Sequence, residues 1–121
     1  IEAFISLKEL FCHVNKLTSL DVSKNTALTL LWCFTNKLKS LDLTNNTALI
    51  VFRCSFNEGL SLDLSKNIAL KKLFCAHNNM TSLDISKNTA LKLLRCEFNK
   101  LKALDLSNNT ALARILSEVV L

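Results

Sequence analysis

The chain has almost none of the residues that usually make turns. Its 121 residues include one glycine, no proline and no tyrosine. A β domain built from hairpins uses glycine in its tight turns, so this composition excludes an ordinary hairpin-rich domain. Because asparagine also tolerates the left-handed backbone conformation, we expect the 13 asparagines to supply the turns. No apolar run approaches the roughly 18 residues of a membrane-spanning helix, so no membrane span is expected.

What the chain does have is apolar residues. They make up 50% of the sequence, and leucine alone accounts for 26 positions. A chain of this length and composition can bury a hydrophobic core, which excludes a disordered protein. We therefore predict one folded domain over residues 1–121.

The five cysteines are evenly spaced and indicate a repeat. They recur every 21 residues, at Cys12, Cys33, Cys54, Cys75 and Cys96. A first set of asparagines keeps the same step, at Asn15, Asn36, Asn57, Asn78 and Asn99. So does a second set, at Asn25, Asn46, Asn67, Asn88 and Asn109. Self-similarity at one fixed period predicts a repeat architecture.

The register divides the chain into repeat units. Five repeats cover residues 7–27, 28–48, 49–69, 70–90 and 91–111. Residues 1–6 form a degenerate half-repeat, and residues 112–121 form a partial or capping repeat. One repeat cannot bury its own leucines, so stacked neighbours about 4.8 Å apart must bury them jointly. Whether the terminal segments are true caps or the chain is a fragment of a longer array stays open.

Residues 28–48 show the full pattern of one repeat, L-x-x-L-x-C-x-x-N-x-L-x-x-L-D-L-x-x-N-x-A. It resembles a leucine-rich repeat, in particular the 21-residue cysteine-ladder type of internalin J-like bacterial surface proteins. The resemblance covers about residues 7–112. It implies a right-handed solenoid of the α/β horseshoe class, with little or no helix. A parallel β-sheet would form the concave face, where many members bind proteins, and extended or 3-10 segments would form the convex face.

Strand alternation gives the direction of each side chain. In L-x-x-L-x-C the two leucines and the cysteine point inward, and the third and fifth positions point outward. The asparagine that follows should hydrogen-bond backbone groups that the bend leaves unpaired. Phe4 and Phe52 are the two aromatic residues that fall in core-facing positions.

The cysteines are predicted to be structural. Equivalent thiols on stacked parallel strands leave their β-carbons farther apart than the roughly 3.8 Å of a disulfide. The chain has no C-x-x-C, and its only histidines are His13 and His77, so we expect no zinc site. Five equivalent cysteines also offer no nucleophile with a base of its own. We therefore expect no enzyme activity and no cofactor.

The D-x-[ST]-x-N segments, such as residues 21–25, resemble the opening of a calcium loop. However, Thr26 stands where that loop needs glycine, and Trp32 stands where it needs a bidentate glutamate. We therefore expect these aspartates to cap backbone amides at a bend and to bind no metal.

The outward positions differ most between repeats and are the candidates for contact with a partner. They hold six basic residues against two acidic ones, a surplus of four, when the whole chain has a net charge of +5. Aromatic residues and arginine are enriched at interface hot spots. The predicted partner-binding residues are Phe11, Trp32, Arg53, Lys72, Phe74, Lys92 and Arg95. Three further aromatic residues fit either contact or packing against the core: Phe34, Phe56 and Phe98.

These features favour a protein–protein interaction module, part of a bacterial surface or secreted protein used in adhesion or host contact. Its partner would have a net-negative and partly apolar surface. Carbohydrate or polyanion binding and a purely structural spacer role are the alternatives, and a cytoplasmic location stays open. Nucleic acid is disfavoured because it usually requires a denser basic stripe.

Overall fold

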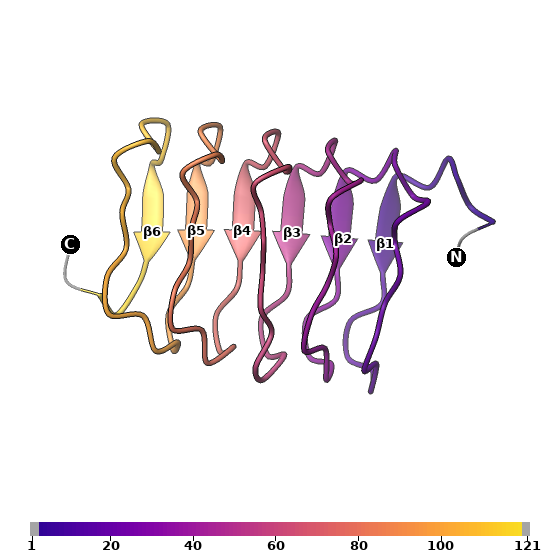
Figure 1. The fold of residues 1–121 in the computed structure, drawn as a ribbon, viewed down its shortest axis with the longest axis horizontal. Helices are drawn as coiled ribbons and strands as arrows, with labels where there is room; N and C mark the ends of the chain where they lie inside the picture. Colours follow the sequence, from indigo (N-terminus) through magenta and orange to yellow (C-terminus); the bar gives the residue numbers. More distant parts are fainter. Residues whose placement is uncertain (1–2, 120–121) are drawn as a thin grey trace.

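The computed structural model describes residues 3–119 as a stack of coils, each of which adds one short strand to a single sheet (Figure 1). The strands are β1 (Glu9–Phe11), β2 (Leu30–Trp32), β3 (Val51–Arg53), β4 (Lys72–Phe74), β5 (Leu93–Arg95) and β6 (Arg114–Leu116). We number each coil after its strand. The described residues include no helix that could cross a membrane.

The strands are parallel and lie in chain order, β1 to β6. Each pairs with the next in a register of one repeat, so that Leu31 lies opposite Leu10 on one side and Phe52 on the other. Equivalent residues of successive repeats therefore stack in columns along the solenoid. The predicted fold class, a leucine-rich-repeat solenoid with a parallel sheet and no helix, is confirmed.

The core lies between the sheet and the returning half of each coil. In coil 2, Leu28, Leu31 and Cys33 are fully buried, and so are their equivalents in coils 3 and 4. A strand of three residues has little stability alone, so burial against the coils above and below must stabilise the array.

The returning half of each coil ends in two consecutive β-turns. In coil 1 the Asn25 N–H donates to the Val22 carbonyl (3.0 Å), and the Leu28 N–H donates to the Asn25 carbonyl (3.2 Å). The same pair of turns recurs in the next four coils. The resemblance implied extended or 3-10 segments on this side. No 3-10 helix occurs in residues 3–119, and the segment before the turns is extended, with one isolated bridge between Ser40 and Ser61.

Two columns of asparagine connect neighbouring coils. The column at the strand ends is represented by Asn57, whose Nδ2 donates to the carbonyls of Cys33 and Cys54 (both 3.0 Å). Its Oδ1 accepts the Leu38 N–H (3.1 Å). In the turns, Asn46 Nδ2 donates to the carbonyls of Val22 and Asn25 (both 3.0 Å). The amides of Asn57 and Asn46 thus each connect their own coil to the preceding one.

The expectation that asparagine supplies the left-handed residues is wrong for all but one of them, Asn79. Gly59, with a φ of 92°, is the one left-handed glycine. The other left-handed residues each stand directly before a strand-end asparagine and have φ between 54° and 59°: Val14, Thr35, Phe56, His77 and Phe98. The asparagine is used instead for its side-chain hydrogen bonds. The preceding residue makes the bend and bears the steric cost, which the surrounding backbone hydrogen bonds must outweigh.

The aromatic residues of uncertain direction point outward. Phe56 is 50% exposed, Phe98 is 56% exposed, and Phe34 is partly exposed. Phe52 is fully buried, as its position predicts. Phe4 is 61% exposed, so its assignment to a core-facing position was wrong. It lies at one end of the described stack, where only one side of its segment has a neighbouring coil.

Candidate interaction surface

The outer face of the sheet carries a column of aromatic and arginine side chains, one from the end of each of the first five strands. We call it the aromatic–arginine column, and its members are Phe11, Trp32, Arg53, Phe74 and Arg95. The middle residue of strands β2 to β5 is buried, which directs the residues on either side of it outward. The parallel register then stacks them side by side.

Arg53 is held between two aromatic rings. Its Cζ lies 4.7 Å from the centroid of the Trp32 ring and 4.6 Å from that of Phe74. Phe11 packs edge-on against Trp32, with 4.8 Å between the ring centroids and 86° between the planes. Each cation–π contact contributes about 0.5–2 kcal/mol, depending on desolvation. These contacts fix the direction of the guanidinium before any partner binds.

The two arginines of the column differ in their freedom to bind a partner. Arg95 donates from Nε to Glu97 Oε1 (3.0 Å) and forms an ion pair with the same carboxylate. The Arg53 guanidinium has no hydrogen bond or ion pair with any other residue in the range 3–119. With both faces against rings, its N–H donors stay available at the edge. The sequence did not predict this difference between the two residues.

The two predicted lysines lie next to the column. Lys72 is the first residue of β4 and is exposed, and Lys92 stands directly before β5 and is also exposed. Neither forms an ion pair within the described residues. All seven predicted residues therefore lie on or beside the outer face of the sheet, with five of them in one column.

His13, one of the two histidines too few for a zinc site, extends the aromatic cluster. Its ring stacks on Phe34 (4.5 Å between centroids, 19° between planes) and lies 5.5 Å from the Trp32 ring. The signal in the sequence was the 21-residue step from position 13 to Phe34, which predicts contact between the two side chains.

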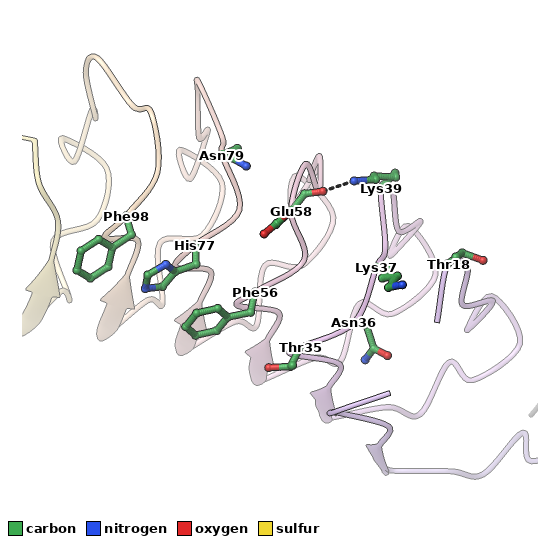
Figure 2. A pocket seen from close by; sticks show the side chains of 10 residues that line it. All are labelled: Thr18, Thr35, Asn36, Lys37, Lys39, Phe56, Glu58, His77, Asn79 and Phe98. Atoms are coloured by element: carbon green, nitrogen blue, oxygen red, sulfur yellow. Dashed lines mark hydrogen bonds between the residues drawn. The ribbon is translucent and has the colours of Figure 1, made fainter. Parts of the chain in front are cut away.

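A second set of rings lies along the edge of the sheet, where the chain leaves the strands. We call it the lateral stack, and it consists of Phe56, His77 and Phe98 (Figure 2). The centroids are 4.1 Å apart between the first two rings and 4.3 Å apart between the last two, with interplanar angles of 12° and 18°. The stack borders a groove of about 800 Å³, a size typical of ligand sites.

Four of the five cysteines are buried, and Cys12 is half-buried. Burial raises the pKa of the Cys33 thiol to about 12, and it raises the pKa of Cys54 and Cys75 well above the usual value. Because the thiolate is the nucleophile and the metal ligand, these thiols are poor candidates for either role near neutral pH. None of the five takes part in a disulfide.

The aspartates cap the bend before the turns. In each case Oδ1 accepts the backbone N–H of the Ser or Thr two residues later, at 2.9–3.0 Å, as Asp21 does from Ser23 and Asp63 from Ser65. Hydrogen bonding from Ser23 and Ser65 lowers the pKa of these two carboxyls. Within residues 3–119 no cluster of three or more His, Cys, Asp or Glu is placed to hold a metal ion.

No protein-family profile and no curated protein matches the chain. Solved structures do. Internalin C2 from Listeria monocytogenes superimposes with a TM-score of 0.87 at 17% identity, covering 97% of this chain and 55% of that one. The internalin inlF from the same species gives 0.62 at 19% identity, covering 93% and 42%.

The functional domain of InlJ from Listeria monocytogenes, which includes a cysteine ladder, aligns at 25% identity with a TM-score of 0.43. That alignment covers 98% of this chain and 41% of the InlJ domain. The present chain spans about half the length of the internalin structures. Its parallel strands, helix-free coils and 21-residue period give it the leucine-rich-repeat solenoid fold of the listerial internalins.

Proposed function

We propose that the chain is a protein–protein interaction module of a bacterial surface or secreted protein, used in adhesion or host contact. It binds its partner through the outer face of the sheet. The observation that carries this proposal is the aromatic–arginine column, in which Arg53 is fixed between Trp32 and Phe74 with its hydrogen-bond donors unused.

The column divides the work of binding between two kinds of group. The aromatic rings offer apolar area at little entropic cost, and they supply most of the affinity. The arginine and lysine charges steer and orient the partner. A partner with a partly apolar and net-negative surface matches both properties.

The proposal is tested by removing the two rings that hold Arg53. A partner is first captured from host-cell surface proteins, identified and purified, and its affinity is measured by calorimetry. Trp32→Ala with Phe74→Ala should weaken binding by roughly 100-fold or more, since hot-spot aromatics each contribute about 2 kcal/mol. The double variant should keep cooperative thermal unfolding, with a melting temperature lowered only by the loss of the cation–π and ring contacts of Trp32 and Phe74.

The matched control is Ile68→Ala. Ile68 is 62% exposed and lies in the turns that precede β4, not in a strand, so its loss should leave the affinity unchanged. Unaltered binding by the double variant, or an equal loss in the control, would refute the assignment of the surface.

The two arginines give a sharper comparison. Arg53→Lys removes the planar donor set from the column and should weaken binding about tenfold, because lysine cannot replace a stacked guanidinium. Arg95→Lys should have a smaller effect, since Glu97 already occupies that guanidinium. Equal losses in the two variants would contradict a special role for Arg53.

Polyanion binding is the second candidate, favoured by Lys71, Lys72 and Lys92. All three side chains are exposed and form no ion pair with another described residue. A heparin column at low salt decides between the candidates, because a protein that is not retained there lacks the electrostatic attraction that a polyanion requires.

A further inference from the structure

The lateral stack ends abruptly at Thr35. Thr35, Phe56, His77 and Phe98 are one repeat apart, and their φ angles lie between 56° and 59°. His77 covers one face of Phe56. The other face is directed toward coil 2, where the side chain at this position is the small Thr35, and no further ring among the described residues contacts Phe56 (Figure 2). An aromatic face is therefore left open beside a small residue.

The left-handed backbone conformation at this position is energetically unfavourable for the residues that occupy it. The left-handed conformation is routine for glycine and asparagine but strained for bulky and β-branched side chains. The chain has 13 asparagines, yet this position holds Val, Thr, Phe, His and Phe in the five repeats. Backbone strain that asparagine or glycine would relieve, but that the sequence retains, is characteristic of functional positions.

Departures from the repeat concentrate at the same groove. The position two residues after the left-handed residue is lysine in three coils, at Lys16, Lys37 and Lys100, but is Glu58 in coil 3 and Asn79 in coil 4. Asn79 and Gly59 are also the two left-handed residues that lie outside the column formed by Val14, Thr35 and the lateral stack. Both Glu58 and Asn79 line the groove.

The coil-2 side of the groove is basic. Lys37 and Lys39 both line the groove and both come from coil 2, as Thr35 does, with Lys39 lying beside Glu58 (Figure 2). The Lys39 ammonium donates to the backbone carbonyl of Glu58, so its charge is positioned but not neutralised. No carboxylate pairs with either lysine in the part of the chain that the structure describes. With Glu58 as the one carboxylate in the lining, the groove keeps a net positive charge that suits an anionic group.

We propose that this groove binds a planar aromatic side chain of a partner protein, stacked on the open face of Phe56 above Thr35. A neighbouring carboxylate of the same partner is held by Lys37 and Lys39. Adjacent coils are about 4.8 Å apart, close to the spacing of the rings in the lateral stack, so one flat ring continues the stack by one step. A puckered sugar ring fits this single step less well and would not use the two ammonium groups.

The probe for this site is N-acetyl-tyrosine, which carries both a planar ring and a carboxylate. In a titration followed by NMR, the Thr35 methyl signal should shift upfield through the ring current, and the Phe56 ring signals should shift with it. For so small a ligand we expect a Kd of about 1 mM. N-acetyl-tyrosinamide, which lacks the carboxylate, should bind several-fold more weakly, and Lys37→Ala should remove that difference in part.

Thr35→Phe is the decisive variant, because it fills the open step with a ring of the protein's own. The equivalent positions Phe56 and Phe98 already hold phenylalanine in the same backbone conformation, so the variant should fold. It should lose at least tenfold in affinity for the probe, whereas Thr35→Ser should bind as the parent does. Phe56→Ala, which removes the stacking face, should also lose binding and serves if Thr35→Phe does not fold.

No member of the aromatic–arginine column lines this groove, although Arg53, Phe74 and Arg95 line a neighbouring pocket together with the lateral stack. Because the probe is placed on the Thr35 side of Phe56, the two proposals can fail independently. Trp32→Ala with Phe74→Ala should leave binding of N-acetyl-tyrosine unchanged. The proposal is overturned if Thr35→Phe binds the probe as the parent does, or if no signal near Thr35 and Phe56 shifts. It is also overturned if methyl galactoside shifts these signals and N-acetyl-tyrosine does not, which would make the groove a carbohydrate site.

Discussion

At the scale of single residues, the bend after each strand depends on two neighbours: the asparagine supplies hydrogen bonds, and the residue before it adopts the left-handed conformation. Asn36 connects coils 1 and 2 through the carbonyls of Cys12 and Cys33 (both 3.0 Å), while Thr35 before it adopts the left-handed conformation. The sequence shows the asparagine period plainly. It does not show which residue turns left-handed, because that choice depends on where the amide must point to reach two carbonyls.

The first prediction concerns this division of work. Val14→Asn should raise the free energy of unfolding by about 1 kcal/mol, because asparagine adopts the left-handed conformation at lower cost than valine. Urea denaturation measures the change. Ile68→Asn is the control: Ile68 is also an exposed apolar residue but has no positive φ, so it should give no gain. A Val14→Asn variant no more stable than the parent would show that the backbone is unstrained there.

The second prediction concerns the amide itself. Asn57→Ala removes two donated hydrogen bonds and one accepted bond in the buried interior. It leaves the Leu38 N–H without its acceptor, and the carbonyls of Cys33 and Cys54 each lose one of two amide donors. It should lower the free energy of unfolding by several kcal/mol, roughly 2–4. Asn15→Ala is the matched control, since the exposed Asn15 side-chain amide donates only within its own coil. A loss below about half a kcal/mol for Asn57→Ala would contradict the structural role.

At the scale of the coil, the sequence predicts the sheet half better than the returning half. The strand positions follow from a two-residue alternation, which places Leu31 inward and Trp32 outward without knowledge of neighbouring coils. The returning half also alternates at first, since Leu41 and Leu43 are buried and Asp42 between them is exposed, but the alternation stops at the turns that follow. Its paired β-turns at Val22–Asn25 and Asn25–Leu28 are held by amides from the next coil, so local sequence alone does not specify them.

The third prediction follows from the buried cysteine column of the coils. Below about pH 7.5 the thiols are protonated in both the folded and the unfolded state, so stability should not depend on their ionisation there. Between pH 9 and 12 the unfolded chain loses thiol protons while the pKa of about 12 keeps Cys33 protonated in the folded state. Each such thiol should then lower the free energy of unfolding by about 1.4 kcal/mol per pH unit.

Denaturation at a series of pH values measures this slope. Cys33→Ala should be less stable at every pH because it leaves a cavity, but its alkaline slope should be shallower by the contribution of one thiol. An unchanged slope would mean that burial does not hold the proton on Cys33.

At the scale of the whole molecule, the solenoid is a linear array in which each coil is stabilised by its neighbours. Cys12 in coil 1 is half-buried, whereas Cys54 and Cys75 in coils 3 and 4 are fully buried. The fourth prediction is that amide hydrogen exchange will be slowest in β3 and β4 and faster in β1 and β6. Uniform protection along the stack would instead indicate one all-or-none unit.

On the surface, the sequence predicts which residues share a face but not how their side chains pair. Alternation and period were enough to place Trp32, Arg53 and Phe74 together on one face. The pairing of Arg95 with Glu97 depends on side-chain rotamers, and the outward direction of Phe56 depends on its left-handed backbone. Neither leaves a mark in the pattern of apolar and polar residues, so both required the three-dimensional structure.

The central claim is that the outer face of the sheet is the binding surface, and hydroxyl-radical footprinting of the complex with the identified partner tests it most directly. The account predicts strong protection of Phe11, Trp32 and Phe74 on binding and no change at Ile68. Protection of Ile68 and the turns, with Trp32 and Phe74 as reactive as in the free protein, would contradict it.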